Sequence, residues 1–595
     1  MIRRTAPISA VTALIVLGLL ILNSGLFVKL AGVAYHILRG GSPDVEIFRR
    51  LGYNCLWYGA LAVIVLLFFK SKDSFTRSDR SVDRLVLIST VFVVLAICAH
   101  GLICMKSAVI EGERYWWLVD DEMISMRYAR NQTNGMGLVW NPGERVEGYS
   151  NFLWTMYMAL IHLLPLPAAK TSLVVLITNV FIIIATIPVI AKVTRLLGGG
   201  TFETACVLVG FVLNLDVTTC TLDGFEAVPI MFLTIYTIYL IIKGMKDSRL
   251  RLSTFFLISL ISLLRADGIV ISLFLYGLAL TLYNDRRKIL IYSLISLVLP
   301  VLFLIFRLVY YGDILPNTAY LKVINWNGRL VAGLLFIKGI ISHYLFLLVL
   351  VVLYTIKSRR AEVVYLTLTI FIYLGYIICV GGDNFYNNRF LLPFIPLLLI
   401  FGIRGVGTMK ISSYWLPLLI ALLFLTLPMQ TAYTVSRPTK PEGVNIGNIE
   451  IGLIIKKNTP VDCTVADYWA GSVFYFSERR GVDLLGKVDP IISRMPPASD
   501  GRLPGHNKFD YDYSLTMKRP DLVVANFALP VDGEEMRACM DGDGAFTGRL
   551  YFHDQFQKQY LNNPVDIGTW RTIFIRADSP LASARDRWKG LEESR

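Results

Sequence analysis

The residues best suited to chemistry are three consecutive acids, Asp120, Asp121 and Glu122, in a polar loop that runs from Trp116 to Trp154. Apolar segments flank this loop. Neighbouring carboxylates repel each other and are costly to desolvate beside a membrane. They persist where they bind a cation, pair with Arg or Lys, or move protons. A solvated loop whose carboxylates cap a helix is the plainer interpretation of the same residues.

The elements that position these acids are predicted to be membrane helices. The 595 residues are 55% hydrophobic and 17% charged, with a mean hydropathy of +0.57. A soluble globular chain rarely has this balance, and about 20 apolar residues cross the hydrocarbon core. About 13 crossings are predicted, near 10–38, 51–70, 85–105, 173–191, 203–222, 225–243, 252–264, 268–283, 288–311, 330–356, 361–380, 390–403 and 412–433.

Basic residues orient these helices, because cytoplasmic loops carry an excess of Lys and Arg. The basic clusters are Arg3-Arg4, 70–84, 243–251, 286–288 and 357–360. Placing all of them inside requires an odd number of crossings and leaves 152–166 as a re-entrant or surface helix. We therefore predict a multi-pass protein of the cytoplasmic (inner) membrane whose C-terminus lies outside. No recognition motif supports nucleic-acid binding as a reason for the net charge of +14.

This topology places five polar clusters on the same, outer side of the membrane, which favours a single active site. They are the Asp120-Asp121 loop and the segments 223–226, 265–268, 310–323 and 381–390.

The composition divides the chain into three parts. Residues 1–84 form an N-terminal extension with two transmembrane helices, and residues 85–436 form the transmembrane catalytic domain with its outer loop at 106–151. After residue 436 the membrane runs end, and short β-type segments alternate with turns and helical stretches at 463–466, 482–485, 521–525 and 570–576. Residues 437–595 are therefore predicted to be an extracytoplasmic soluble domain of the α/β or α+β class.

A sugar joined to a polyprenyl phosphate would suit this arrangement. Its lipid tail would lie between helices, and its phosphate would need fixed cations at the outer interface. Arg389, Lys322 and Arg307 are candidates because each lies at the outer end of an apolar run. A loop carboxylate could take the proton of the attacking acceptor hydroxyl, and the departing phosphate needs no separate general acid. Snorkelling of these cations at the interface is the alternative.

Several motifs resemble a known family. The run D-D-x-x-I-S-x-R-Y-A-R-N, followed by G-L-V-x-N-P-G-E-R-V-E-G-Y-S-N-F-L-W, is similar to the GT-C membrane glycosyltransferases typified by mycobacterial arabinofuranosyltransferase B. The resemblance continues, in order, from about residue 85 to 530. Its further motifs are Gly224-Phe225-Glu226, Arg265-Ala266-Asp267-Gly268, Tyr310 to Val323, Gly382-Asp383 with Arg389-Phe390, Asp483 to Pro490 and Pro504 to Leu515. Ala266 stands where this family usually has Pro.

The resemblance implies a mostly α fold, a GT-C transmembrane bundle whose first outer loop carries the catalytic Asp, with an extracytoplasmic C-terminal domain. It implies Asp121 as the catalytic carboxylate, assisted by Asp120. This pair could also bind a divalent cation, Mg²⁺ or Mn²⁺. The residues expected at the sugar or acceptor are Arg127, Tyr128, Glu147, Tyr149, Asn151, Glu226, Asn317, Asp383, His506 and Lys508.

The predicted function is therefore transfer of a pentofuranosyl unit, D-arabinofuranosyl by resemblance, from polyprenyl phosphate to an extracytoplasmic acceptor such as a cell-envelope glycan. Decaprenyl-phosphoryl arabinose is the donor of the mycobacterial members. One alternative keeps this chemistry but uses a pilin or other protein, or lipid A or lipopolysaccharide, as acceptor for a different sugar. The others are a transporter or flippase, which predicts charges at mid-membrane, and a glycan-binding scaffold.

Overall fold

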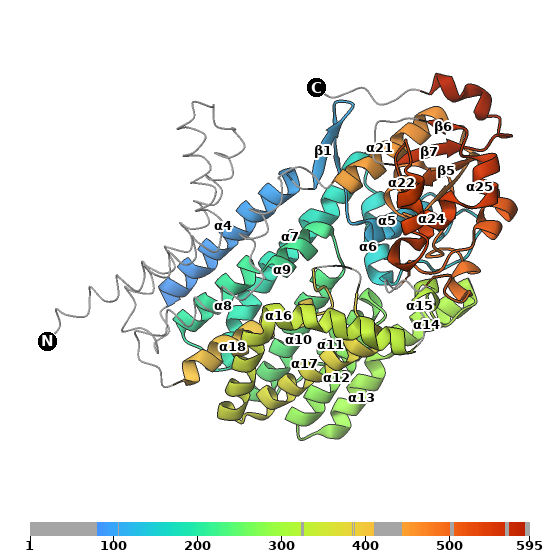
Figure 1. Ribbon diagram of the computed structural model, residues 1–595. Coiled ribbons are helices and arrows are strands. Elements are labelled where there is room, and N and C mark those ends of the chain that lie inside the picture. Colours follow the sequence, from blue (N-terminus) through green and yellow to red (C-terminus); the bar gives the residue numbers. More distant parts are fainter. Residues whose placement is uncertain are drawn as a thin grey trace, which may run out of the picture.

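The computed structural model describes residues 80–104, 106–322, 326–383, 385, 387–409, 443–499, 505–565 and 571–588. A long helical bundle carries a smaller C-terminal domain at one end, and the outer loop lies between the two (Figure 1). The mostly α bundle with a sheet-containing C-terminal domain agrees with the fold predicted from the sequence.

Apolar helices build the bundle. They are α4 (Arg80–Cys104), α7 (Ala168–Leu196), α8 (Thr201–Leu213), α9 (Leu215–Asp223), α10 (Ala227–Lys246), α11 (Leu252–Leu264), α12 (Gly268–Leu282), α13 (Arg286–Ser296), α14 (Val298–Tyr311), α16 (Trp326–Ser358), α17 (Ala361–Val380), η1 (Leu392–Phe394) and α18 (Ile395–Thr408). Among the described residues, five helical spans are long and apolar enough to cross a membrane. Six shorter apolar helices accompany them, and the chain is a polytopic membrane protein.

The helices follow the predicted apolar runs closely. The run 252–264 coincides with α11, and 361–380 coincides with α17. The run 203–222 is divided at Asn214, whose extended backbone ends α8 and whose side chain accepts a hydrogen bond from the Val217 N–H to begin α9. The predicted runs 10–38, 51–70 and 412–433 lie outside the described residues.

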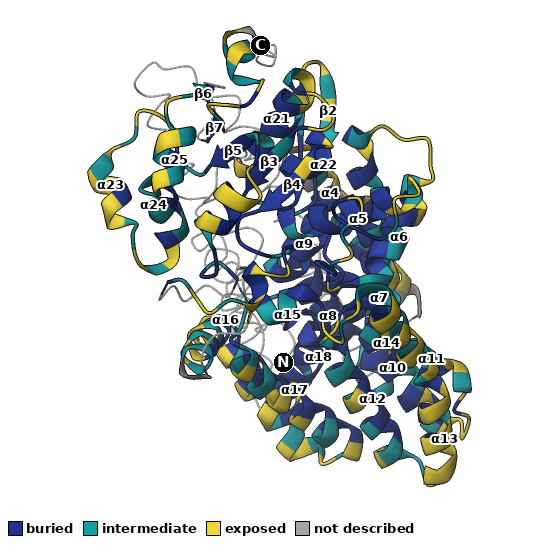
Figure 2. Ribbon diagram, turned by 90° about the vertical axis from the view of Figure 1, so that its right-hand side faces the viewer, coloured by how far each residue is buried: buried dark blue, intermediate teal, exposed yellow. Residues whose placement is uncertain are grey.

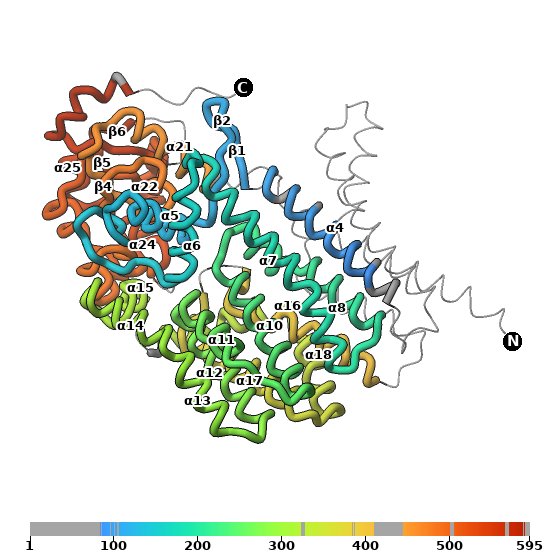
Figure 3. Tube along the Cα trace, turned by 180° about the vertical axis from the view of Figure 1, so that it is seen from behind, coloured from blue at the N-terminus to red at the C-terminus, as the bar shows by residue number. Residues whose placement is uncertain are grey.

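The outer loop contains regular structure. Strands β1 (Ser107–Ile110) and β2 (Glu113–Trp116) form an antiparallel hairpin that leads into α5 (Asp120–Thr133). The segment predicted as a short surface helix at 152–166 forms α6 (Phe152–His162). The short helix α15 (Asn317–Leu321) follows α14 and lies beneath the C-terminal domain (Figure 3).

The C-terminal domain is built on a five-stranded mixed sheet. Its strands are ordered β4 (Arg480–Asp483), β3 (Thr464–Asp467), β5 (Leu522–Ala525), β7 (Thr572–Ile575) and β6 (Pro564–Val565). Strands β4, β3 and β5 are parallel, and β7 is antiparallel to both of its neighbours. Its helices are α21 (Gly443–Asn458), α22 (Ser472–Ser477), η2 (Ile492–Arg494), η3 (Asp512–Met517), α23 (Gly533–Ala538), η4 (Gly542–Gly544), α24 (Ala545–Tyr551), α25 (Asp554–Gln559) and η5 (Ala582–Arg587).

The outer loop and the C-terminal domain share one hydrophobic core. Ile124 and Tyr128 of α5 and Trp140 of the loop pack in the same cluster as Val465 of β3 and Phe474 of α22. The Trp140 and Phe474 rings meet edge to face with 4.7 Å between their centroids. Figure 2 shows α5 and the central strands as buried. This shared core fixes the position of the C-terminal domain relative to the acids at the start of α5.

Candidate active site

The three acids of the loop occupy the first turn of α5, where the helix dipole favours negative charge. Successive residues of an α-helix point about 100° apart, because 3.6 residues make a turn. Asp120, Asp121 and Glu122 therefore face different surroundings, and each has its own partners.

Asp120 fastens the loop to the C-terminal domain. Its two carboxylate oxygens accept hydrogen bonds from the backbone N–H groups of Ser472, at 2.8 Å, and Gly471, at 3.1 Å. These groups lie at the start of α22, and Gly471 leaves no room for a Cβ against the Asp120 backbone. Burial raises the pKa of Asp120, although Lys487 and the two N–H groups oppose that rise. Asp120 thus acts as a cap on α22.

Asp121 is the accessible acid of the three. Its side chain is 36% exposed, and its Oδ1 lies 3.0 Å from Nζ of Lys487 in the C-terminal domain. Burial opposes ionisation of Asp121, but Lys487, Arg389 and Lys322 outweigh it and lower its pKa. The carboxylate is therefore charged at neutral pH and can be reached by a substrate.

The segment that presents Lys487 is a tight turn held from two sides. The Asp483 carboxylate accepts hydrogen bonds from the N–H groups of Leu485 and Val488, and Gly486 has a positive φ of 76° that other residues rarely adopt. From the bundle side, the Asn317 amide donates to the carbonyl oxygens of Gly486, Lys487 and Asp489. Lys487 is consequently aimed at Asp121 by both domains.

Arg389 and Lys322 supply positive charge beside Asp121. The Arg389 guanidinium pairs with Asp383, with 2.5 Å from Nε to Oδ2, and is flanked by the Phe225 and Phe385 rings. Lys322 follows α15, is exposed, and interacts electrostatically with Asp383, Arg389 and Asp121. These two predicted phosphate ligands therefore meet the predicted catalytic acid.

Arg265 forms a second basic position in the same cluster. It lies 2.8 Å from Asp267 and 3.6 Å from Glu226, and its guanidinium stacks on the Phe390 ring. It also interacts electrostatically with Arg389 and Asp383. The helices α10, α12 and α17 begin or end at these residues, so the polar clusters of 223–226, 265–268 and 381–390 meet at one end of the bundle.

Glu122 and Glu226 are two buried carboxyl groups that lie close enough to interact electrostatically. The Asn151 amide donates to Oε2 of Glu122 at 3.0 Å. Burial raises the pKa of Glu122 well above its usual range, and the nearby Glu226 raises it further. Glu122 is therefore harder to ionise than its neighbour Asp121, whose pKa is lowered.

Several predicted ligand residues instead hold the structure together. Arg307 pairs with both oxygens of Glu147, at 2.6 and 3.1 Å, and donates to the carbonyl oxygen of Ile314. Arg127 donates to the carbonyl oxygens of Trp140, Phe474 and Arg479. These guanidinium groups are occupied by the protein, which is a different role from the phosphate or sugar binding predicted for them.

The remaining predicted residues also make structural contacts. The Tyr128 hydroxyl donates to the Val146 carbonyl, and the Tyr149 hydroxyl hydrogen-bonds that of Tyr311. Lys508 donates to the carbonyl oxygens of Tyr320 and Ser493, and the His506 ring lies 6.4 Å from that of Phe546.

The Asp pair does not fit a divalent cation in this arrangement. Both oxygens of Asp120 accept backbone hydrogen bonds, and Asp121 is paired with Lys487. Across the described part of the chain, no group of three or more His, Cys, Asp or Glu side chains could hold a metal ion.

Sequence reasoning missed Lys487, Asp483 and Arg265 as site residues. Lys487 lies within the motif Asp483 to Pro490, and Arg265 within Arg265-Ala266-Asp267-Gly268, but neither motif by itself indicates a role for its cation. The pairing of Lys487 with Asp121, 366 positions away, has no local signal in the sequence.

Solved structures share this fold. The chain is similar to archaeal oligosaccharyltransferase AglB from Archaeoglobus fulgidus, solved with an inhibitory peptide and a dolichol-phosphate, with a TM-score of 0.51, 10% identity, and coverage of 84% of this chain and 75% of that one. It is also similar to ArnT from Cupriavidus metallidurans bound to undecaprenyl phosphate, with a TM-score of 0.52, 10% identity, and coverage of 82% and 98%. The GT-C-type fold expected from the sequence is therefore confirmed.

Sequence comparison adds one match. Residues 438–581 match the model of a domain of unknown function (DUF8728). This range covers most of the C-terminal domain. No curated protein matches the chain.

Proposed function

We propose that this chain is a membrane glycosyltransferase that moves a sugar from a polyprenyl-phosphate carrier to an acceptor hydroxyl outside the cytoplasmic membrane. The observation that carries the proposal is the position of Asp121. Its carboxylate is ionised and accessible at one end of the bundle, beside Lys487, Arg389 and Lys322. The two structures of similar fold, solved with dolichol-phosphate and undecaprenyl phosphate, support a lipid-phosphate donor.

The chemistry divides between the acid and the cations. The acceptor oxygen attacks the anomeric carbon and forms the new glycosidic bond, while the bond from that carbon to the phosphate oxygen breaks. The acceptor proton passes to Asp121. The electron pair of the broken bond leaves with the phosphate, whose charge is stabilised by Lys322, Lys487 and Arg389.

Glu226, which lies beside Glu122, holds Arg265 at the edge of the site through an ion pair. Asp383 orients Arg389 through two hydrogen bonds, so the guanidinium keeps its direction before the donor arrives. Such preorganised charge lowers the barrier without reorganisation during the reaction.

For the sugar, we propose a pentofuranosyl unit, D-arabinofuranose, and for the acceptor a cell-envelope glycan. The motif resemblance from about residue 85 to 530 supports this choice. A protein or lipid A acceptor for a different sugar keeps the same chemistry. The charged clusters lie at the ends of the helices, where this enzyme would need them. A transporter would instead be expected to have charges at mid-membrane.

The test uses full-length protein with radiolabelled polyprenyl-phosphoryl arabinofuranose and a panel of glycan acceptors. Asp121→Asn is expected to lower transfer by about 10²- to 10⁴-fold while the protein stays folded and binds donor. Glu144→Gln is the matched control, because Glu144 lies in the same loop but pairs with the exposed Arg480. Equal transfer rates for wild type and Asp121→Asn would show that Asp121 is not the base.

If the folded wild-type protein does not use the arabinose donor but transfers another sugar from a polyprenyl carrier, only the pentofuranosyl assignment is wrong. If the folded wild-type protein transfers no sugar from any polyprenyl-linked donor, the proposal that it is a glycosyltransferase is wrong.

A further inference from the structure

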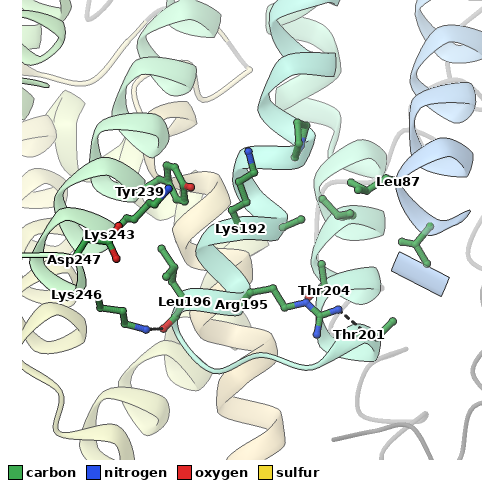
Figure 4. A pocket seen from close by; sticks show the side chains of 14 residues that line it. Leu87, Lys192, Arg195, Leu196, Thr201, Thr204, Tyr239, Lys243, Lys246 and Asp247 are labelled. Carbon is green, nitrogen blue, oxygen red and sulfur yellow. Dashed lines mark hydrogen bonds between the residues drawn. The ribbon is translucent and has the colours of Figure 1, made fainter. Parts of the chain in front are cut away.

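A second polar site lies at the far end of the bundle from Asp121. It is a pocket of about 480 Å³ between α4, α7, α8 and α10 (Figure 4). Helix α10 begins after Glu226, in the Asp121 cluster, and ends at Lys246, which lines the pocket. Its 20 residues rise about 30 Å, the thickness of the hydrocarbon core. The pocket and the candidate active site therefore open at opposite membrane faces.

The pocket is strongly basic. Lys192 and Arg195 of α7 and Lys243 and Lys246 of α10 line it, and Asp247 is the one acid in its lining. Small-molecule sites usually have volumes of about 300–1,000 Å³, so the pocket is large enough for a phosphate group and the atoms around it. Such a charge excess indicates an anionic ligand.

Two of the four cations form hydrogen bonds with the protein, and two lie beside an aromatic ring. Lys246 donates to the Leu196 carbonyl at 2.9 Å, and Arg195 donates to the Thr201 hydroxyl at 2.8 Å. Lys192 and Lys243 are exposed and lie on the two sides of Tyr239, each with its Nζ 5.7 Å from the ring centroid. Within the described residues, neither of these two lysines forms an ion pair with a carboxylate.

The rest of the pocket is apolar. Its wall contains Val86 and Leu87 of α4, Pro188 and Ala191 of α7, and Leu208 of α8. A soluble anion would leave this wall in contact with water, whereas a lipid would cover it. The pocket also lies at the ends of two helices that are apolar enough to span the membrane, α7 and α10, where lipid headgroups are found.

We propose that this pocket binds an anionic phospholipid, with the phosphate between Lys192 and Lys243 and the first part of an acyl chain against Val86 and Leu208. Basic pockets between membrane helices bind such headgroups, and the lipids of the cytoplasmic leaflet are often anionic. The basic loop 243–251 is typical of that face. This site is independent of the sugar chemistry proposed above.

The test is native mass spectrometry of the full-length protein in mild detergent, titrated with phosphatidylglycerol or phosphatidylcholine. Wild type is expected to prefer phosphatidylglycerol. The double variant Lys192→Gln/Lys243→Gln is expected to lose about 10- to 30-fold of that affinity, and phosphatidylcholine binding should not change. The matched control is Lys288→Gln/Lys357→Gln, because both lysines are exposed at helix ends, Lys288 lies beside the Tyr292 ring, and neither lines the pocket.

Three results would overturn the proposal. They are equal affinity for the two phospholipids, equal loss in the two double variants, and unchanged phosphatidylglycerol binding in Lys192→Gln/Lys243→Gln. A third titration uses undecaprenyl phosphate. If this lipid displaces phosphatidylglycerol and depends on the same two lysines, the pocket belongs to the carrier lipid and the phospholipid assignment fails.

Discussion

Asp121 and Lys487 are 366 positions apart in the chain, yet Oδ1 of one lies 3.0 Å from Nζ of the other. The ion pair joins the membrane domain to the C-terminal domain at the most accessible acid of the site. It keeps Asp121 ionised and makes it a weaker base. A donor phosphate would compete for Lys487 and Arg389, so Asp121 would become more basic when the donor is bound.

Replacing Lys487 by Met should therefore change the pH dependence of transfer. Lys487 lowers the pKa of Asp121, so its removal raises that pKa, and Asp121 becomes protonated at a higher pH as the solution is acidified. The acidic limb of the rate profile should move up by about 1 pH unit or more. Lys518→Met is the control, because Lys518 is exposed in the same domain. Superimposable profiles of wild type and Lys487→Met would show that the pair does not set the charge of Asp121.

Asn317 should act as a positioning residue through the turn that carries Lys487. Asn317→Ala leaves the carbonyl oxygens of Gly486, Lys487 and Asp489 without their amide donor, which costs about 1–3 kcal/mol of stability. The acidic limb should shift in the same direction as in Lys487→Met, a change that lost stability alone does not produce. Asn317→Asp should show the same shift, because an ionised carboxylate cannot donate hydrogen bonds to these carbonyl oxygens. A normal pH profile in Asn317→Asp would contradict this role, and Asn562→Ala, at an exposed position, is the control.

The sequence predicts the helical bundle well, because each membrane helix is a continuous apolar run that local composition reveals. The run 252–264, too short for a certain crossing, still coincided with α11. Asp121 stands out in the sequence for a similar reason, since adjacent acids in an apolar chain are conspicuous. Arg127 and Arg307 were assigned to ligands because a guanidinium looks the same in sequence whether a substrate or a protein carbonyl fills it.

The partners of Asp121 could not be predicted in the same way. Lys487 is one of many lysines in the C-terminal domain, and its pairing depends on how that domain docks on α5. The docking itself depends on the packing of Trp140 against Phe474 and on hydrogen bonds between the same distant segments, such as that from the Trp140 indole to the Ala470 carbonyl. Residue type therefore draws attention to Asp121, and tertiary packing determines which charged groups surround it.

Glu122→Gln should remove a pH-dependent loss of stability. The folded pKa of Glu122 is raised, so its contribution to stability is complete below the unfolded pKa of about 4.3 and is lost as pH rises toward the folded value. Gln cannot ionise, can accept from Asn151 and can donate to Glu226. The melting temperature of wild type should therefore fall relative to Glu122→Gln as the pH rises above about 4.3, as followed by intrinsic fluorescence in detergent. Parallel curves for the two proteins would show that folding does not raise the pKa of Glu122.

Asp120 and Asp121 should respond differently to the same chemical change. Asp120→Asn keeps one oxygen for the Ser472 N–H but loses the acceptor for Gly471, so the cap on α22 weakens by about 0.5–2 kcal/mol. Its melting temperature should drop, and its transfer rate at a temperature where it is folded should fall far less than that of Asp121→Asn. Asp121→Asn should show the reverse, because removing an accessible, partly exposed charge leaves the packing intact. If Asp120→Asn instead abolishes transfer with an unchanged melting temperature, Asp120 is the base and the ion pair of Asp121 with Lys487 is the structural contact.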